Sequence, residues 1–377
     1  MSASLALSLS AATVRAEAPE VVVDIAPMHS IVARVMEGAG TPSLLLPPGA
    51  SPHGYALRPS EARALSNADI VVWTGPALTP WLERSLETLG EGATQLVLME
   101  APGVEHLPLR EGPLFEHDHD HGHDHGGHDE HGHDDHDHEE HADKAHGDHD
   151  HDHDHDHDHD HDHDHDHGEH AHGEDDHGHD PKEAGHDGHG HGDDDHHAGH
   201  GHADERDAHI WLNPANAARI AEAAAAALSA ADPDRAALYE ANAAAAAAEY
   251  AALSTEIAKT VEPIGGRPYV VLHDAYQHFE RRFGVEAAGS ISAGDGGEEA
   301  GLGPARLAAL QERIGELGAV CVFAEPQFPD RTLTALTEGM PAKTGELDPL
   351  GAALEPGPAL YPALLEALAA SLVECLG

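Results

Sequence analysis

Short apolar runs alternate with amphipathic stretches along most of the chain. The runs are rich in β-branched residues, which is typical of buried strands, and the stretches between them have the apolar spacing of helices. The predicted strands are 21–25, 43–46, 70–73, 95–98, 268–272, 285–291, 319–323 and 342–347. The predicted helices are 30–36, 59–67, 80–89, 216–229, 233–261, 275–283, 305–317, 331–338 and 361–375. Alternating strands and helices predict parallel βαβ units and an α/β fold.

Two α/β lobes and a connector account for most of the chain. The Ala-rich stretch 233–261 has its one proline at the first position, which favours a single helix of ~43 Å at ~1.5 Å per residue. We therefore expect a first lobe at 19–116 plus 206–232, a linking helix at 233–262 and a second lobe at 263–377. Each lobe is expected to hold a mostly parallel sheet flanked by helices.

The segment 117–205 differs in composition from everything around it. It holds 33 of the 39 histidines and 33 acidic residues against two lysines, so 31 of the 51 net negative charges lie there. It has no apolar periodicity and cannot bury enough apolar surface to offset the entropy of ordering. We expect a long disordered His/Asp-rich insertion, which is tolerated because closure entropy grows slowly with loop length.

The net charge of -51 limits the partners of the chain. It repels phosphate backbones and anionic lipid surfaces, which disfavours nucleic-acid binding and attachment to a membrane surface. It attracts cations. The expected partner is therefore a cation.

The N-terminus and the cysteines indicate export. Residues 1–18 read as the remnant of a secretory signal, an apolar stretch followed by small residues. No apolar run approaches the roughly 20 residues that span a bilayer. The two cysteines, Cys321 and Cys375, either form one disulfide, as an even count in an exported protein suggests, or remain two buried free thiols.

Three of the six histidines outside the insertion lie where strands end or loops begin. His53 follows a strand in a turn-rich stretch, His209 follows the insertion, and His273 ends a predicted parallel strand. Ligands of open α/β sheets bind beyond the carboxyl ends of the strands, and three neutral imidazoles with a carboxylate or water complete a tetrahedral zinc site. Asp348 is the candidate carboxylate, and Glu325 is its rival.

The remaining histidines and two acids have simpler interpretations. His29 and His278 are interpreted as surface residues or as outer partners of a site, and His106 as part of a Pro-rich loop. Asp207 and Asp274 each stand beside a candidate ligand. A carboxylate there either accepts the second ring N–H of the histidine or caps a helix.

Five segments resemble the ZnuA-type periplasmic binding proteins of bacterial ABC zinc importers. They are 51–60 (SPHGYALRPS), 207–214 (DAHIWLNP), 273–279 (HDAYQHF), 324–328 (AEPQF) and 347–351 (LDPLG). They occur in order over nearly the whole chain, and a His/acid-rich insertion precedes the second. The insertion itself, at 89 residues, is long and unusually pure in His, Asp and Gly.

The resemblance implies two α/β lobes joined by one long helix, with zinc held between the lobes by His53, His209 and His273. It implies a periplasmic monomer that delivers zinc to a membrane ABC permease and has no enzymatic activity. The fourth ligand varies in such proteins between a carboxylate and water, so Asp348 is carried over as a candidate. Manganese-binding relatives replace the third histidine by a carboxylate, so His273 indicates zinc. The resemblance also implies a disulfide between Cys321 and Cys375.

Two other functions fit parts of the sequence. Three histidines with an open position also describe the zinc of a hydrolase, although no motif places a general base. Alternatively, the insertion is a metal store and the lobes are its scaffold. Whatever the function of the lobes, the many imidazoles of the insertion can provide several weak zinc sites. They predict a local zinc reservoir that raises zinc capture when the metal is scarce.

Overall fold

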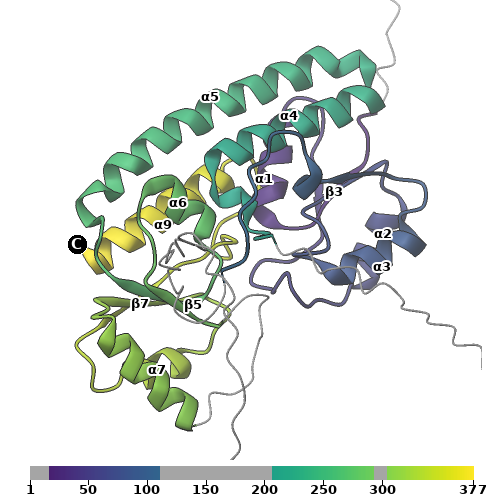
Figure 1. The fold of residues 1–377 in the computed structure, drawn as a ribbon. Helices are drawn as coiled ribbons and strands as arrows, with labels where there is room; N and C mark the ends of the chain where they lie inside the picture. The colour runs from purple at the N-terminus through teal and green to yellow at the C-terminus, as the bar shows by residue number, and fades with distance from the viewer. Residues whose placement is uncertain (1–16, 111–205, 293–303) are drawn as a thin grey trace, which may run out of the picture. The chain divides into compact units, whose positions relative to one another are not determined.

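The computed structural model describes residues 17–110, 206–292 and 304–377 (Figure 1). The predicted insertion at 117–205 and residues 1–16 of the expected signal segment lie outside the described residues.

The first sheet is parallel, with strand order β2-β1-β3-β4. Its strands are β1 (Val21–Val23), β2 (Ser43–Leu44), β3 (Ile70–Trp73) and β4 (Thr94–Val97), followed by a 3-10 turn, η1 (Leu98–Glu100). The intervening helices are α1 (Ala26–Val35), α2 (Pro59–Ser66) and α3 (Pro80–Leu89). Both central strands are buried throughout, as expected where helices cover both faces of a parallel sheet.

The second sheet is also parallel, in the order β6-β5-β7-β8. Its strands are β5 (Tyr269–His273), β6 (Gly289–Ser292), β7 (Cys321–Ala324) and β8 (Lys343–Glu346). The accompanying helices are α6 (Gln277–Phe283), α7 (Pro304–Glu316), α8 (Asp330–Thr337) and α9 (Leu360–Leu376). The prediction of an α/β fold with two mostly parallel sheets is confirmed.

Between the sheets in sequence come η2 (Ile210–Leu212), α4 (Pro214–Ala231), η3 (Pro233–Arg235), α5 (Ala236–Val261) and η4 (Glu262–Ile264). The predicted helix 233–261 begins three residues late, because Asp232 pairs with Arg235 and accepts a hydrogen bond from Tyr239 around a 3-10 turn. With 26 residues, α5 is ~39 Å long. It packs against α1 and α4 and also against α6 and α9 (Figure 1).

One apolar core joins the two sheets. It runs from Val23 and Ile31 beside the first sheet to Val271 and Leu365 beside the second. Hydrogen bonds cross the same region: the backbone N–H of Tyr361 donates to Ser30 Oγ at 2.9 Å, and its hydroxyl donates to the Trp211 carbonyl at 2.8 Å. The indole N–H of Trp211 in turn donates to the Pro349 carbonyl at 2.8 Å. This shared packing opposes a hinge motion that separates the two halves.

No helix among the described residues is both long enough and apolar enough to cross a bilayer.

Cys321 on β7 and Cys375 on α9 form a disulfide, as predicted. Both residues are buried, and their Cα atoms are 6.2 Å apart. The bond attaches the C-terminal helix to a central strand of the second sheet. Lys343 Nζ donates to the Cys375 carbonyl at 2.9 Å and reinforces the attachment.

Replacing both cysteines by alanine is expected to lower the free energy of unfolding by about 4 kcal/mol. The bond spans a sequence separation of 54 residues, and opening a loop of that size returns conformational entropy to the unfolded chain. Urea unfolding of the zinc-free protein measures the change. A loss of stability under about 1 kcal/mol would contradict the expectation.

Candidate metal centre

Three histidines from distant parts of the chain meet at one point. His53 lies in the loop between β2 and α2, His209 directly precedes η2, and His273 is the last residue of β5. Their candidate donor atoms all lie within 4.8 Å of one another, and the ring centroids are 5.0 to 5.9 Å apart. Nitrogens bound to a tetrahedral zinc at ~2.0–2.1 Å lie ~3.3–3.4 Å apart, so small side-chain rotations bring the three into ligating positions.

Burial keeps His53 in the neutral form that binds metals. His209 and His273 are each only 6% exposed, and His53 is partly buried. Burial, together with the charges that the other two rings carry when protonated, lowers the pKa of His53 to about 3. His53 is therefore neutral at any physiological pH, and a neutral imidazole is the form that offers a lone pair to a metal.

Two carboxylates orient two of the rings. Asp207 Oδ1 accepts hydrogen bonds from His209 Nδ1 at 2.8 Å and from the His209 backbone N–H at 2.9 Å. Glu325 Oε1 accepts from His273 Nδ1 at 2.9 Å. With Nδ1 protonated and held, Nε2 of each ring is left as the metal ligand.

The carboxylate of Glu325 also changes the proton affinity of His273. Burial acts to lower the pKa of this histidine, but the charge of Glu325 and its hydrogen bond outweigh burial and raise it. A metal ion must therefore displace a proton from His273 over a wider range of pH than from an ordinary histidine. Asp207, although burial opposes its ionisation, has a lowered pKa because His209 stabilises its charge.

The loop that carries His53 is held from its flanks. Trp81 Nε1 on α3 donates to the Pro52 carbonyl at 2.7 Å, and the Tyr55 hydroxyl donates to the Glu61 carboxylate on α2 at 2.9 Å. The Tyr55 and Trp81 rings pack edge to face with centroids 5.4 Å apart. His53 itself has no carboxylate partner among the described residues, and its buried Nε2 makes no hydrogen bond there. It is the least restrained of the three rings.

The structure brings together three of the four predicted ligands. Asp348 is not in the cluster; its Oδ1 accepts the backbone N–H groups of Leu350 and Gly351, and its Oδ2 accepts that of Ala352 at 2.6 Å. This carboxylate caps the turn after β8. Glu325, the rival, is bonded to His273 instead.

The outer role of Glu325 was missed from the sequence, although a signal for it exists. In the register of β5 against β7, Val271 lies opposite Phe323, so two residues further along His273 lies beside Glu325. A histidine and a glutamate at the ends of adjacent parallel strands are therefore expected to meet. Sequence alone did not show that these two strands are neighbours.

The alternatives left open for the other polar residues are now decided. Asp207 orients the His209 ring. Asp274 does neither of the things proposed for it, because Arg110 binds it with two guanidinium nitrogens and also donates to Glu280 at 2.6 Å. His278 is buried, at 1% exposed, so its interpretation as a surface residue is wrong. His29 is also buried, and its Nε2 donates to the Pro42 carbonyl at 3.0 Å.

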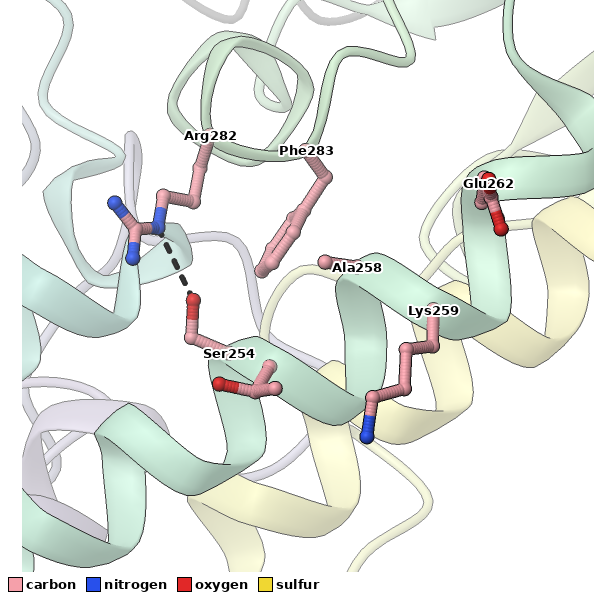
Figure 2. A pocket seen from close by; sticks show the side chains of 7 residues that line it. Ser254, Ala258, Lys259, Glu262, Arg282 and Phe283 are labelled. Atoms are coloured by element: carbon pink, nitrogen blue, oxygen red, sulfur yellow. Dashed lines mark hydrogen bonds between the residues drawn. The ribbon is translucent and has the colours of Figure 1, made fainter.

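A second concave feature lies between α5 and α6 and lacks metal-binding character. It is a groove of about 450 Å³ lined by Ser254, Lys259, Glu262, Arg282 and Phe283, with two further α5 residues (Figure 2). Arg282 Nε donates to Ser254 Oγ at 3.1 Å across it. The lining contains one carboxylate and no histidine, so the chemistry of the histidine cluster is not repeated there.

The chain is similar to known zinc-uptake proteins. The family model for ZnuA, the periplasmic component A of a zinc-uptake complex, matches residues 21–375. The high-affinity zinc uptake system protein ZnuA of Brucella abortus is 42% identical over 356 residues, which cover 94% of this chain and 91% of that protein. The protein of the same name from Paracoccus denitrificans is 38% identical over 373 residues, covering 99% and 96%.

Solved structures agree on the fold. A crystal structure of ZnuA has a TM-score of 0.62 at 20% identity and covers 96% of this chain and 100% of its own. The periplasmic zinc-binding protein TroA from Treponema pallidum has a TM-score of 0.62 at 15% identity, covering 96% and 99%.

Replacing Glu325 by Gln is expected to weaken zinc binding by ~10- to 100-fold, the usual effect of losing the outer partner of a ligating histidine. The substitution also removes the charge that raises the pKa of His273. Zinc affinity rises with pH until His273 is deprotonated, so in the variant this rise shifts to lower pH. Competition with a chelator from pH 5 to 8 measures both effects.

Glu346→Gln is the matched control, because Glu346 ends the neighbouring strand β8 with an exposed side chain. It should bind zinc as the unaltered protein does. An affinity and pH profile for Glu325→Gln that match this control would refute the assigned role of Glu325.

Proposed function

The chain belongs to the ZnuA family of periplasmic zinc-uptake components, and we propose that His53, His209 and His273 are the ligands of its zinc ion. Members of this family bind zinc as cargo and work with an ABC permease in the membrane. The chain is accordingly a zinc-binding solute-binding protein and not an enzyme. Zinc is the ion it transports rather than a resident cofactor.

The convergence of three imidazoles, two buried and one partly buried, supports the ligand assignment most directly. Each comes from a different segment, yet their donor atoms lie within 4.8 Å of one another. Nitrogen donors suit zinc, whereas manganese and magnesium prefer oxygen. The carboxylates of Asp207 and Glu325 hold two of the histidine rings, so the donor set offered to the ion is three nitrogens.

We propose that water completes the coordination. Asp348 remains the protein alternative, but both its oxygens already accept backbone N–H groups in the turn after β8. Moving this carboxylate onto the ion would leave those N–H groups without partners. A water ligand costs no such rearrangement.

Zinc entry and release are proposed to use local motion. The core shared by the two sheets and the packing of α5 against both halves oppose a wide hinge. His53 is the ligand without a carboxylate partner among the described residues, and it lies in a loop. Movement of this loop is the least costly way to open the coordination sphere.

Export through a signal within residues 1–18 and action as a monomer are further proposals. Among the described residues, Leu109 is the one large hydrophobic side chain classed as exposed, at 40%. A stable homodimer buries a substantial apolar patch, and a single side chain does not supply one. The insertion is proposed to be auxiliary, because all three proposed ligands lie outside it.

Substituting alanine singly for His53, His209 or His273 in a variant lacking residues 117–205 is expected to lower zinc affinity by more than ~100-fold. Removing a ligand should exceed the ~10- to 100-fold cost of removing an outer partner. Deletion alone should leave one tightly bound zinc per chain, measured by elemental analysis and chelator competition. Full affinity in all three alanine variants would refute the site, and loss of tight binding on deletion alone would favour storage by the insertion.

Replacing Asp348 by Asn in the same background separates the two candidates for the fourth ligand. If water holds the position, the affinity for zinc changes less than about threefold, because Asp348 then does not touch the ion; the amide oxygen can still accept the N–H groups of Leu350 and Gly351, whereas that of Ala352 loses its acceptor. A drop of 100-fold or more would instead make Asp348 a ligand, since a carboxylate oxygen bound to zinc is lost. Isothermal titration calorimetry with a competing chelator measures the zinc affinity.

A further inference from the structure

Two buried polar side chains next to the metal centre have atoms without a hydrogen-bond partner. His278 is 1% exposed, and neither of its ring nitrogens makes a well-formed hydrogen bond among the described residues, although the backbone carbonyl of Asp207 lies near the ring. Asp207 is 3% exposed. Its Oδ1 accepts a hydrogen bond from His209, whereas its Oδ2 has no hydrogen-bond partner among the described residues. A buried polar group left unpaired costs ~1–3 kcal/mol, so such groups in folded proteins normally pair.

The two residues are close to each other. His278 lies on α6, which packs against η2, the 3-10 turn that begins directly after His209. Burial lowers the pKa of His278, and the charge and backbone carbonyl of Asp207 oppose that shift. The imidazole therefore lies within the field of the carboxylate that orients a proposed zinc ligand. The His278 ring lacks a well-formed hydrogen bond to an acceptor, and Asp207 Oδ2 lacks a donor.

We infer that His278 is a positioning residue of the zinc site, whose imidazole donates a hydrogen bond to Asp207 Oδ2 directly or through one water molecule. The result is a series of interactions in which His278 is hydrogen-bonded to Asp207, Asp207 is hydrogen-bonded to His209, and His209 binds the ion. The inference rests on the proposed role of His209 as a ligand. His278 itself is not a ligand, because its nitrogens lie outside the cluster of donor atoms.

The second hydrogen bond has a defined physical effect. A carboxylate bonded through Oδ1 alone can rotate about its Cβ–Cγ bond and carry the His209 ring with it. A donor on Oδ2 fixes the plane of the carboxylate and thus the direction of the His209 lone pair. Outer partners of this kind act by reducing the reorganisation that metal binding requires.

The helix that carries His278 is itself anchored. Arg110 donates to Glu280 at 2.6 Å from outside the helix, and the Tyr269 hydroxyl on β5 lies 3.3 Å from the same carboxylate. Gly284 ends the helix in the left-handed conformation at φ 68°, which glycine adopts without strain. The imidazole is therefore presented from a fixed position, as a positioning residue must be.

Replacing His278 by Phe in the full chain keeps the ring volume and removes both ring nitrogens. We expect zinc at the tight site to bind about 3- to 10-fold more weakly, less than the ~10- to 100-fold effect of a direct partner. His278→Gln, which retains an N–H donor, should recover most of the loss. Chelator competition at one equivalent of zinc measures affinity, with His209→Ala reporting what the insertion alone binds.

A double-mutant cycle separates positioning from packing. In an Asp207→Asn background, His278→Phe should change affinity less than about 1.5-fold, because the carboxylate through which it acts is gone. His29→Phe is the matched control, a buried histidine on α1 that bonds Pro42, and it should lower the melting temperature of the zinc-free protein without changing zinc affinity.

Equal losses from His278→Phe in both backgrounds, or no loss in either, would overturn the inference while leaving the proposed site intact. If His209→Ala binds zinc as tightly as the unaltered chain, the site itself is wrong, which is a different outcome. Should the Phe variant not fold, His278→Met removes the same donors with a more adaptable side chain and takes its place in the cycle.

Discussion

The arrangement depends on three imidazoles aimed at one point, with His209 and His273 buried and His53 kept neutral. Three like groups that each tend to gain a proton repel one another when charged, and burial makes their charged forms costlier still, which is why the pKa of His53 falls to about 3. Asp207 and Glu325 fix two rings by accepting their Nδ1 protons. A dication supplies positive charge at this point once it displaces the proton that Glu325 favours on His273.

The fold provides this geometry through the ends of parallel strands. His273 ends β5, and Glu325 follows β7, the neighbouring strand, so their hydrogen bond follows from sheet register. His53 follows β2 of the other sheet, in a loop held by Trp81 and Tyr55. The common core and α5 keep the two sheets together, so the ligands from both arrive already close. Three nitrogen donors at this point favour zinc over cations that prefer oxygen, such as manganese and magnesium.

Much of this was accessible from the sequence. β-branched runs alternating with helical spacing predicted the eight strands of the described residues, and the strand Ile70–Trp73 and the helix Pro80–Leu89 have their predicted bounds. The three histidines stood out because they end strands or begin loops. Contacts between distant segments were not accessible from the sequence. Glu325 was considered as a metal ligand because the order of the strands was unknown. Asp274 was considered as a ring partner or a helix cap because the position of Arg110 was unknown. Local turn chemistry likewise placed Asp348 in a cap.

The most direct test is to locate the ion by anomalous diffraction at the zinc edge, from crystals of the chain loaded with one equivalent of zinc. The account predicts one dominant peak, with nitrogens of His53, His209 and His273 ~2.0–2.1 Å from it. A dominant peak elsewhere, or one at this point that lacks any of the three nitrogens, would contradict it.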